Sequence, residues 1–304
     1  MPDVLHNPFA GPGRFYKGNL HTHSTASDGV RSPEEVCALY REGGYDFLAL
    51  TDHFMKRFGF PLTDTRAFRT PRFTTIPSAE LHAPAIMQGE PWHLVAVGLP
   101  ADFAPPTPEE FGPALAARAV AAGAFVAMAH PAWYGMTLAD AETVPSAHAV
   151  EIYNHASEVD VARGDGAWML DALLARGRRI LTIAVDDSHG HFADWFGGWV
   201  MVKAGSLEPE ALVAALKAGR YYSTQGPEIL GIEFDGTDIA VECSPAASIA
   251  VLGRAPASKT AFGEGLRGAR LPVAGLRPGG YARVVVTDAA GRRAWSNPLW
   301  FDAA

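Results

Sequence analysis

The sequence predicts an α/β protein made of repeated strand–helix steps, followed by a smaller all-β domain. Three observations predict it. Apolar runs of strand length alternate with helical patterns up to about residue 225. His, Asp and Glu recur at the ends of these strands, and after about residue 226 the helical patterns stop. Parallel strands with polar groups at their ends are typical of the active sites of α/β barrels and doubly wound sheets.

Composition indicates an ordinary globular protein. The chain has 304 residues, 48% hydrophobic and 19% charged, enough for a large domain plus a small one. A net charge of −8 argues against nucleic-acid binding through a basic surface. With neither a signal-peptide pattern nor an apolar run of about 18 residues, we expect a cytoplasmic protein without membrane contact. Cys37 and Cys243 lie outside any CxxC pattern, so no disulfide or zinc ribbon is expected.

The first strand is expected to deliver two histidines. Residues 1–14 are rich in Pro and Gly and predict an N-terminal arm, after which residues 15–20 form a short strand. His21 and His23 are two positions apart, so on a strand their side chains project to the same side. Two imidazoles that converge on one point are a common start of a transition-metal site.

A capped helix and a second strand come next. Ser32 is a helix N-cap, Pro33 occupies the first helical position and Glu35 completes a capping box. The pattern ends at Gly43-Gly44, a C-terminal signal. The apolar run 45–53 then predicts a strand that ends on Thr51, Asp52 and His53. Strand, helix, glycine and strand in this order predict a βαβ unit with parallel strands.

Later strands and helices repeat this pattern. Residues 54–72 predict a loop or short helix over the strand ends. A second capped helix is expected from Thr107, with Glu110 as its partner, to Gly123, and further helices at residues 168–178 and 209–219. One further strand begins at His93. Four others end on polar residues: the first on Glu80, the second on His130, the third on Asn154 and His155, and the fourth on Asp186, Asp187, His189 and His191.

The last segment, residues 226–304, predicts a separate domain. Short β-type runs, such as 238–244 and 248–254, are separated by Gly, Pro and Asp, with no amphipathic helix between them. This pattern predicts a small antiparallel β-sandwich, closer to the immunoglobulin-like class than to a barrel. It carries no cluster of metal-ligand residues.

If the strands share one sheet edge, nine nitrogen and oxygen ligands converge. They are His21, His23, Asp28, His53, Glu80, His93, His130, Asp187 and His189. One catalytic metal needs about three protein ligands, so this set predicts two or three ions. With imidazole and carboxylate ligands and no thiolate, Mn²⁺, Zn²⁺ and Fe²⁺ all remain open.

Six motifs in order resemble those of the PHP (polymerase and histidinol phosphatase) superfamily. They are HTHSTASDG, LALTDH, SAE, the isolated His93, AHP and DDSH, within residues 15–225. The opening GNLHTHSTASDGVRSPEEV and the tail AWSNPLW look most like the branch with carbaryl-hydrolase-like proteins and small phosphoesterases. The resemblance implies a distorted seven-stranded (β/α) barrel with a trinuclear site at the carboxyl ends of its strands.

The resemblance also implies how the ligands divide. One ion would take His21, His23, Glu80 and Asp187, a second, bridged by Glu80, would take His93 and His130, and a third would take Asp28, His53 and His189. Some members of the superfamily have His at the position of Asp28, and that choice affects metal preference.

The implied activity is hydrolysis of a small or nucleotide-like phosphate mono- or diester by a hydroxide that bridges two metals. Asp187 or His189 would relay a proton to the leaving group. The first alternative is hydrolysis of a carbamate or carboxylic ester at the same site. A different class of function is a non-catalytic metal-binding module whose β-domain docks a partner.

Other residues are expected near the site without being ligands. Asp52 either orients His53 or caps the loop that follows, and His82 shares a face with Glu80 and is expected to line the pocket. Trp133 and Tyr134 either stack on a substrate ring or pack over the strand ends. The pocket wall is expected to include Asn154 and His155. Asp186 is expected to be structural, and the solvated histidines are expected to be His6, His148 and His191. The domain junction is expected to be sealed by Tyr221, Tyr222 and Gln225. The basic residues of the loop after His53 are expected either to bind phosphate or to be solvated; they are Lys56, Arg57, Arg66 and Arg69.

Overall fold

The computed structural model describes residues 4–5 and 7–301. Its strands are β1 (Val4–Leu5), β2 (Arg14–Asn19), β3 (Phe47–Leu50), β4 (His53–Phe54), β5 (Thr74–Ala83), β6 (Trp92–Val97), β7 (Phe125–Met128), β8 (Ala149–Asn154), β9 (Leu181–Val185), β10 (Trp199–Ala204), β11 (Tyr221–Thr224), β12 (Ile229–Phe234), β13 (Asp238–Leu252), β14 (Ser258–Pro272), β15 (Tyr281–Thr287), β16 (Arg293–Ser296) and β17 (Leu299–Phe301). Its helices are α1 (Pro33–Glu42), α2 (Gly112–Ala121), α3 (Leu138–Glu142), α4 (His155–Val161), α5 (Ala167–Ala175) and α6 (Pro209–Lys217), with 3₁₀ turns η1 (Lys56–Phe58), η2 (Arg66–Phe68) and η3 (Arg277–Gly279).

The strands that carry the predicted ligands pair in a mixed sheet. β2, β3 and β5 run parallel, with Gly18 beside Phe47 and Phe47 beside Thr74. β6 runs antiparallel to both β5 and β7, and β8 and β9 continue parallel to β7. Because β6 is reversed, its beginning lies at the edge where its neighbours end. This explains why a histidine at the start of a strand, His93, can join residues at the ends of the others.

The two ends of this series of strands meet. Thr22, just after β2, forms a parallel bridge with Ser188, just after β9. The backbone N–H of Asp187 donates to the carbonyl of His21, and that of His23 donates to the carbonyl of Ser188, at 2.9 and 2.8 Å. These bonds hold the first and last ligand-bearing segments side by side.

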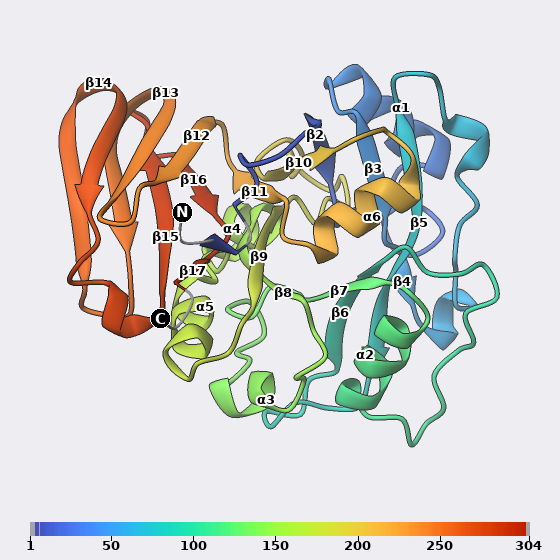
Figure 1. The fold of residues 1–304 in the computed structure, drawn as a ribbon. Coiled ribbons are helices and arrows are strands. Elements are labelled where there is room, and N and C mark those ends of the chain that lie inside the picture. The colour runs from blue at the N-terminus through green and yellow to red at the C-terminus, as the bar shows by residue number, and fades with distance from the viewer. Residues whose placement is uncertain (1–3, 6, 302–304) are drawn as a thin grey trace.

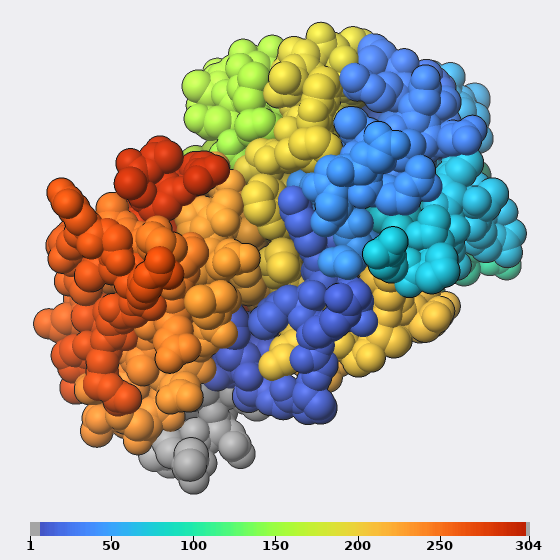
Figure 2. All heavy atoms as spheres, turned by 90° about the horizontal axis from the view of Figure 1, so that it is seen from above, coloured from blue at the N-terminus to red at the C-terminus, as the bar shows by residue number. Residues whose placement is uncertain are grey.

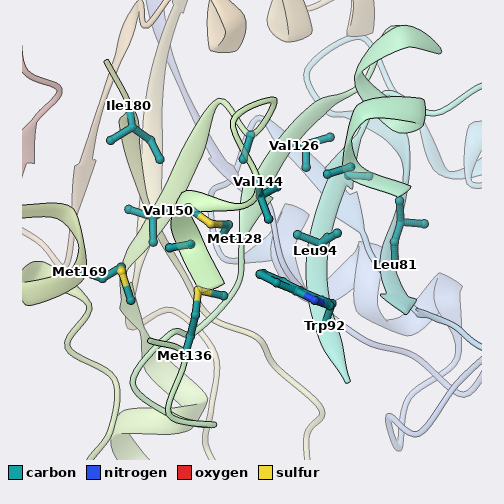
Figure 3. Close-up of a cluster of buried hydrophobic side chains, with 14 of the residues drawn as sticks. Leu81, Trp92, Leu94, Val126, Met128, Met136, Val144, Val150, Met169 and Ile180 are labelled. Carbon is teal, nitrogen blue, oxygen red and sulfur yellow. The ribbon is translucent and has the colours of Figure 1, made fainter. Parts of the chain in front are cut away.

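Apolar side chains cover both faces of these strands. The outer cluster packs against α2 and α5 and includes Leu81, Trp92 and Met128, drawn in Figure 3. The inner cluster lies on the opposite face and includes Val95 and Ile183. Each fully buried side chain of this size contributes about 1.5–3 kcal/mol of hydrophobic stabilisation. Since neighbours on a strand point to opposite faces, the residues flanking Leu81 and Trp92 project to the inner side.

The chain after β11 forms antiparallel pairs only, within the part that the structure describes. β12 to β15 form a lobe beside the α/β part, orange to red in Figures 1 and 2. The two strands predicted at 238–244 and 248–254 are one continuous strand, β13, so that separation was wrong. Its pairing register shifts between Glu242 and Ala246, which accommodates Pro245, a residue without an N–H to donate to the ladder.

Buried polar contacts join the two parts. The Asn297 side chain accepts from the backbone N–H of Thr182 at 2.9 Å and donates to the carbonyls of Tyr221 and Gly219 at 3.0 and 3.2 Å. Arg283 on β15 donates to Asp171 on α5 at 3.0 and 2.9 Å. The tail motif AWSNPLW therefore serves as a structural connection.

Tyr222 and Gln225 also lie at this junction, as predicted. Tyr222 pairs with Ser296 of β16 and belongs to the core of the β lobe, while Tyr221 belongs to the inner cluster. The backbone N–H of Gln225 donates to the carbonyl of Arg293, and its side chain accepts from the N–H of the same residue.

Of the two predicted capping boxes, one was right and one was wrong. α1 has the expected capping box of Ser32 and Glu35. The second box was wrong, because α2 begins only at Gly112, with Phe111 as N-cap and no side-chain cap. The Glu110 carboxylate instead accepts from Arg118 at 2.7 and 2.8 Å. Proline in the first turn of α2 places the helix start later.

The short helices α3 and α4 and the strand β10 were not predicted. Both cysteines are buried and free, in agreement with the expectation of no disulfide. None of the helices in the described part of the chain is both long and apolar enough to cross a membrane.

Candidate metal centre

Glu80 on β5 lies at the middle of the predicted ligand set and is fully buried. Its Oε1 is 2.7 Å from Nδ1 of His93, 3.3 Å from Nε2 of His130 and 3.7 Å from Nε2 of His21. Its Oε2 is 2.5 Å from Nδ1 of His53. The two oxygens of one carboxylate thus face different groups of imidazoles, as a bridging ligand would.

Asp187 faces the two histidines of the first strand. Its Oδ1 lies 3.0 Å from Nε2 of His23 and 3.2 Å from Nε2 of His21. Its Oδ2 accepts from the side-chain amide of Asn154 at 3.0 Å. Asp187 has a φ of 57° and His130 a φ of 21°, sparsely populated values for residues with a Cβ. Such backbone strain is concentrated at functional sites.

Asp28 belongs to a third group on the solvent side. Its carboxylate lies 3.2 Å from Nε2 of His53 and 3.5 Å from Nε2 of His189. The rings of His23 and His189 stack with centroids 4.1 Å apart. Gly29 keeps the turn tight, because an added Cβ would lie 2.8 Å from the backbone of His23. The eleven residues from Asn19 to Gly29 therefore reach two parts of the site.

All nine predicted ligands come together in overlapping groups. The groups whose ligand atoms lie within 4.8 Å of one another are His21, His23 and Asp187; His21, Glu80 and His130; His23, Asp28, His53 and His189; and His53, Glu80 and His82. His93 joins through its 2.7 Å contact with Glu80. The assignment of particular residues to particular ions stays a prediction.

Glu151 on β8 is a buried residue of the site that the sequence analysis missed. Its Oε1 accepts from Nδ1–H of His21 at 2.7 Å. Its Oε2 accepts from the backbone N–H of His130 and the amide of Asn154, at 2.7 and 2.9 Å. A carboxylate on Nδ1 fixes the ring orientation, so Nε2 of His21, which faces Asp187 and Glu80, is the nitrogen available to a metal. The feature of the sequence that could have identified Glu151 is its position as a lone Glu in the apolar strand AVEIYN.

The electrostatics keep the carboxylates ionised. Burial opposes ionisation, yet the surrounding imidazoles hold the pKa values of Glu80 and Asp187 well below the usual range. Burial also disfavours the charged form of His53, but the carboxylates of Glu80 and Asp28 outweigh it and raise the pKa of His53 to about 10. Without an ion, protons on the imidazoles thus supply part of the charge that the carboxylates require.

The donor set fits divalent cations. Within residues 4–5 and 7–301, several buried atoms that face the centre have no hydrogen-bond partner, including Nε2 of His21, Oε2 of Glu80 and Oδ1 of Asp28. Buried polar atoms are normally paired, and an unpaired set that converges is explained by a cation. Imidazole nitrogens with carboxylate oxygens suit Zn²⁺, Mn²⁺ or Fe²⁺.

An open pocket of 470 Å³ lies over this centre. Its wall includes Asp28, His53, Met55, Arg57, His82, Glu90, Pro91, His93, His130, Trp133, Ala156, Ser157, Asp160, Asp187, His189, His191 and Phe192. A small molecule therefore has access to the ligand groups from solvent. Trp133 is 39% exposed at the wall, and Tyr134 is buried beside His93 and His130.

Three further predicted residues have clear positions. The Asp52 carboxylate holds two loops: it accepts from the backbone and hydroxyl of Ser24 and from the hydroxyl of Ser27, after His23, and from the hydroxyl of Thr63 at 3.4 Å, in the loop after His53. His155 is not among the residues that line the pocket, because Asn154 caps α4 and the His155 ring turns toward the hydroxyl of Tyr153, at 2.9 Å. Asn154 does not line the pocket either, so the prediction of these two residues as pocket wall was wrong.

Asp186 is structural, as predicted. It accepts from the hydroxyl of Tyr40 and from the backbone N–H groups of Phe196, Gly197 and Gly198, at 2.7–2.9 Å. These bonds turn its side chain away from the ligand groups that Asp187 joins.

The predicted basic residues separate into different roles. Arg57 lines the pocket, and one of its nitrogens lies 4.0 Å from Oδ2 of Asp28. Arg66 pairs with Asp64 at 2.6 Å, and Arg69 donates to the carbonyl of Thr75 at 2.7 Å. Lys56 lines a neighbouring apolar pocket. Arg57 is thus the basic residue of this loop that faces the ligand groups.

The three histidines expected to be solvated also differ. His191 is exposed and lines the pocket. His148 is half-buried, and its Nδ1 accepts from the backbone N–H of Val126 at 3.1 Å. His6 lies outside the described residues.

The chain resembles solved structures of other proteins to different degrees. A two-domain protein containing a predicted PHP-like metal-dependent phosphoesterase, from Bacteroides vulgatus ATCC 8482, matches over 95% of each chain, with a TM-score of 0.51 and 15% identity. An amidohydrolase from Chromobacterium violaceum, solved with bound sulfate, matches over 58% of this chain and 89% of its own, with a TM-score of 0.44 and 15% identity. No protein-family model and no curated protein matches the sequence. The first match shows that this chain has the fold of a two-domain PHP-like protein.

Proposed function

We propose that this chain is a metal-dependent hydrolase of the PHP type, and that it cleaves a small phosphate ester. The observation that carries the proposal is the convergence of eight His and Asp residues from distant segments with one buried carboxylate, Glu80. The fold of the Bacteroides vulgatus protein supports it. We also propose that the site lies in a distorted seven-stranded (β/α) barrel and that a C-terminal β-sandwich follows it.

His21, His23, Glu80 and Asp187 with their neighbours would hold two or three divalent ions. When bound, such ions lower the pKa of water and neutralise the charge of a phosphate. The protein's own contribution is to orient these ligands. Glu151 fixes the tautomer of His21, and Asn154 holds the Asp187 carboxylate by its second oxygen.

His189 is placed to transfer a proton. Its Nδ1–H donates to the carbonyl of Asp187 at 2.8 Å, which leaves Nε2 facing Asp28 at the pocket wall. When Nε2 is not bound to an ion, a ring oriented in this way can pass a proton at Nε2 to a leaving-group oxygen in the pocket. The guanidinium of Arg57, at the same wall, supports an anionic substrate, because it can pair with a phosphate oxygen.

A second candidate is hydrolysis of a carbamate or carboxylic ester with an apolar group. A neighbouring pocket of 690 Å³ has mainly apolar walls, among them Phe54, Phe60 and Pro84. It shares Met55, His82 and Pro91 with the pocket over the ligand groups. An ester bound across both pockets would place its apolar group in the neighbouring pocket. This mode of binding does not require a negatively charged substrate.

A substrate panel separates the two candidates. Protein loaded with Mn²⁺ or with Zn²⁺ is offered p-nitrophenyl phosphate, bis-p-nitrophenyl phosphate and a 1-naphthyl carbamate. We expect turnover of a phosphate ester that is lost in Asp187→Asn and retained in the exposed control Asp102→Asn. Carbamate turnover with no phosphate release under either metal would select the second candidate. Metal binding without turnover of any ester would favour a binding module.

A further inference from the structure

The sheet register places His82 in the same group as Glu80 and His53. In the parallel pair β4–β5, His53 lies beside Glu80, and in the antiparallel pair β5–β6, His82 lies directly opposite His93. Residues opposite one another share a face of the sheet. The rings of His82 and His93 accordingly meet with centroids 4.3 Å apart. Alternation along β5 brings Glu80 to this face as well.

Three potential ligand atoms converge at this point. Nε2 of His82 is 2.8 Å from Nδ1 of His53 and 3.4 Å from Oε2 of Glu80, while the latter two atoms are 2.5 Å apart. All three residues are buried, with exposures of 6%, 8% and 0%. Ligand atoms of one tetrahedral zinc lie roughly 3.3–3.5 Å apart, since each bond is about 2.0–2.1 Å. The His82–Glu80 separation matches this, and His53 would move slightly outward to join.

Hydrogen bonding alone leaves this group incompletely satisfied. The single N–H that His53 can place on Nδ1 faces two acceptors, Glu80 and His82, and can be directed well at only one. Oε2 of Glu80, one of the three atoms, has no hydrogen-bond partner within the described residues. One cation between the three atoms would satisfy the lone pairs of all of them.

We propose that His82 is a metal ligand, which together with Oε2 of Glu80 and Nδ1 of His53 holds a divalent ion at a position distinct from the one beside Asp28. Two imidazoles and a carboxylate are a donor set that Zn²⁺ accepts with a fourth position left open. The inference rests on the proposed metal centre and adds a tenth ligand to it. The open side of this position faces both pockets, because His82 lines each of them.

The two nitrogens of His53 connect the two positions. Nδ1 faces Glu80 and His82, whereas Nε2 lies 3.2 Å from Oδ2 of Asp28. A neutral imidazole has one lone pair, so His53 serves one of these positions at a time. The position beside Asp28 keeps Asp28 and His189 when His53 serves the other.

Zinc titration of variants tests the inference. Chelator-treated protein is titrated with Zn²⁺ against a chromophoric chelator, and bound ions are counted by elemental analysis after desalting. His82→Phe keeps a ring of similar size and removes both nitrogens. We expect it to lose one ion per chain, or to bind one ion at least about tenfold more weakly than the wild type. The matched control is His148→Phe, outside the site.

Asp28→Asn and the double variant show whether the positions are distinct. Separate positions predict that each single variant loses or weakens one ion and that the double variant loses or weakens two. An equal effect of the single and double variants would overturn the second position. If His82→Phe unfolds without metal, His82→Ala replaces it. If the His82 variants bind as many zinc ions as the wild type and with the same affinity, only the role of His82 is overturned. If the wild type binds no zinc, the metal centre is overturned as well.

Discussion

Nδ1 of His21 lies 2.7 Å from Oε1 of Glu151, across 130 residues of sequence, and both side chains are fully buried. The contact determines which nitrogen of His21 is available as a ligand. It also connects three segments, because Glu151 accepts from the backbone N–H of His130 and from Asn154. The orientation of the first imidazole thus depends on a strand in the middle of the chain.

Removing this carboxylate should weaken metal binding without removing a ligand. In Glu151→Gln an amide replaces the anionic acceptor, so His21 loses the partner that fixes its tautomer. We expect metal affinity to fall about 10–100-fold. Competition with a chromophoric chelator measures it. Glu109→Gln, on the surface, is the matched control, and equal affinities of the two variants would contradict this role.

The metal-free protein should lose stability as the pH rises above neutrality. The pKa of His53 is raised to about 10 in the folded protein, against about 6.5 in the unfolded chain. Stabilisation by the protonated ring is therefore complete below about pH 6.5 and is lost as the pH rises through about 10. A bound cation replaces that proton, so the metal-loaded protein should not show the loss.

Urea unfolding at several pH values tests this expectation. The chelated wild type should show a midpoint that falls between pH 6.5 and pH 9.5, and chelated His53→Gln should show a smaller fall. The same pH dependence in both chelated proteins would refute the assignment to His53.

Arg57 should matter for anionic substrates only. Its guanidinium lines the pocket and is 62% exposed, so its contact with a phosphate is worth up to about 1 kcal/mol. In Arg57→Ala we expect KM for a phosphate ester to rise about two- to fivefold, with kcat little changed. KM for an uncharged carbamate should not change. Arg72→Ala is the exposed control, and an equal rise of KM for both substrates would argue against charge recognition.

Asn297 should be needed for stability rather than chemistry. Replacing it with Ala leaves three buried backbone groups, of Thr182, Gly219 and Tyr221, without their partners. Each costs about 1–3 kcal/mol, so we expect Asn297→Ala to lower the free energy of unfolding by about 3–9 kcal/mol. Gln88→Ala removes one exposed bond and should cost less than about 1 kcal/mol. Similar losses in both variants would show that the connection is unimportant.

Local patterns made much of the fold predictable. The capping box of Ser32 and Glu35 is decided within four residues, and α1 begins as predicted. Alternation placed His21 with His23 correctly, since both side chains face Asp187. The helix predicted to begin at Thr107 begins at Gly112 instead, because Pro113 favours a helix start there. Glu110, the expected partner of Thr107, accepts from Arg118.

Contacts set by register could not be predicted from local patterns. His82 meets His53 because β4 and β6 pair with β5 in one particular register. Glu151 has no nearby ligand in the sequence, and its partner His21 becomes its neighbour only when β2 and β8 are assembled. The ligand list was accessible from strand ends, whereas the residues that orient the ligands depend on tertiary structure.

The central claim is that the convergent groups around Glu80 hold catalytic metal ions. The direct measurement is the rate of ester hydrolysis by chelator-treated protein as Mn²⁺ or Zn²⁺ is added back, with bound ions counted at each step. We predict no turnover without metal and a rate that rises with bound ions to a plateau at two or three per chain. Turnover that is unchanged by complete metal removal, or no ester hydrolysis at full occupancy, would contradict it.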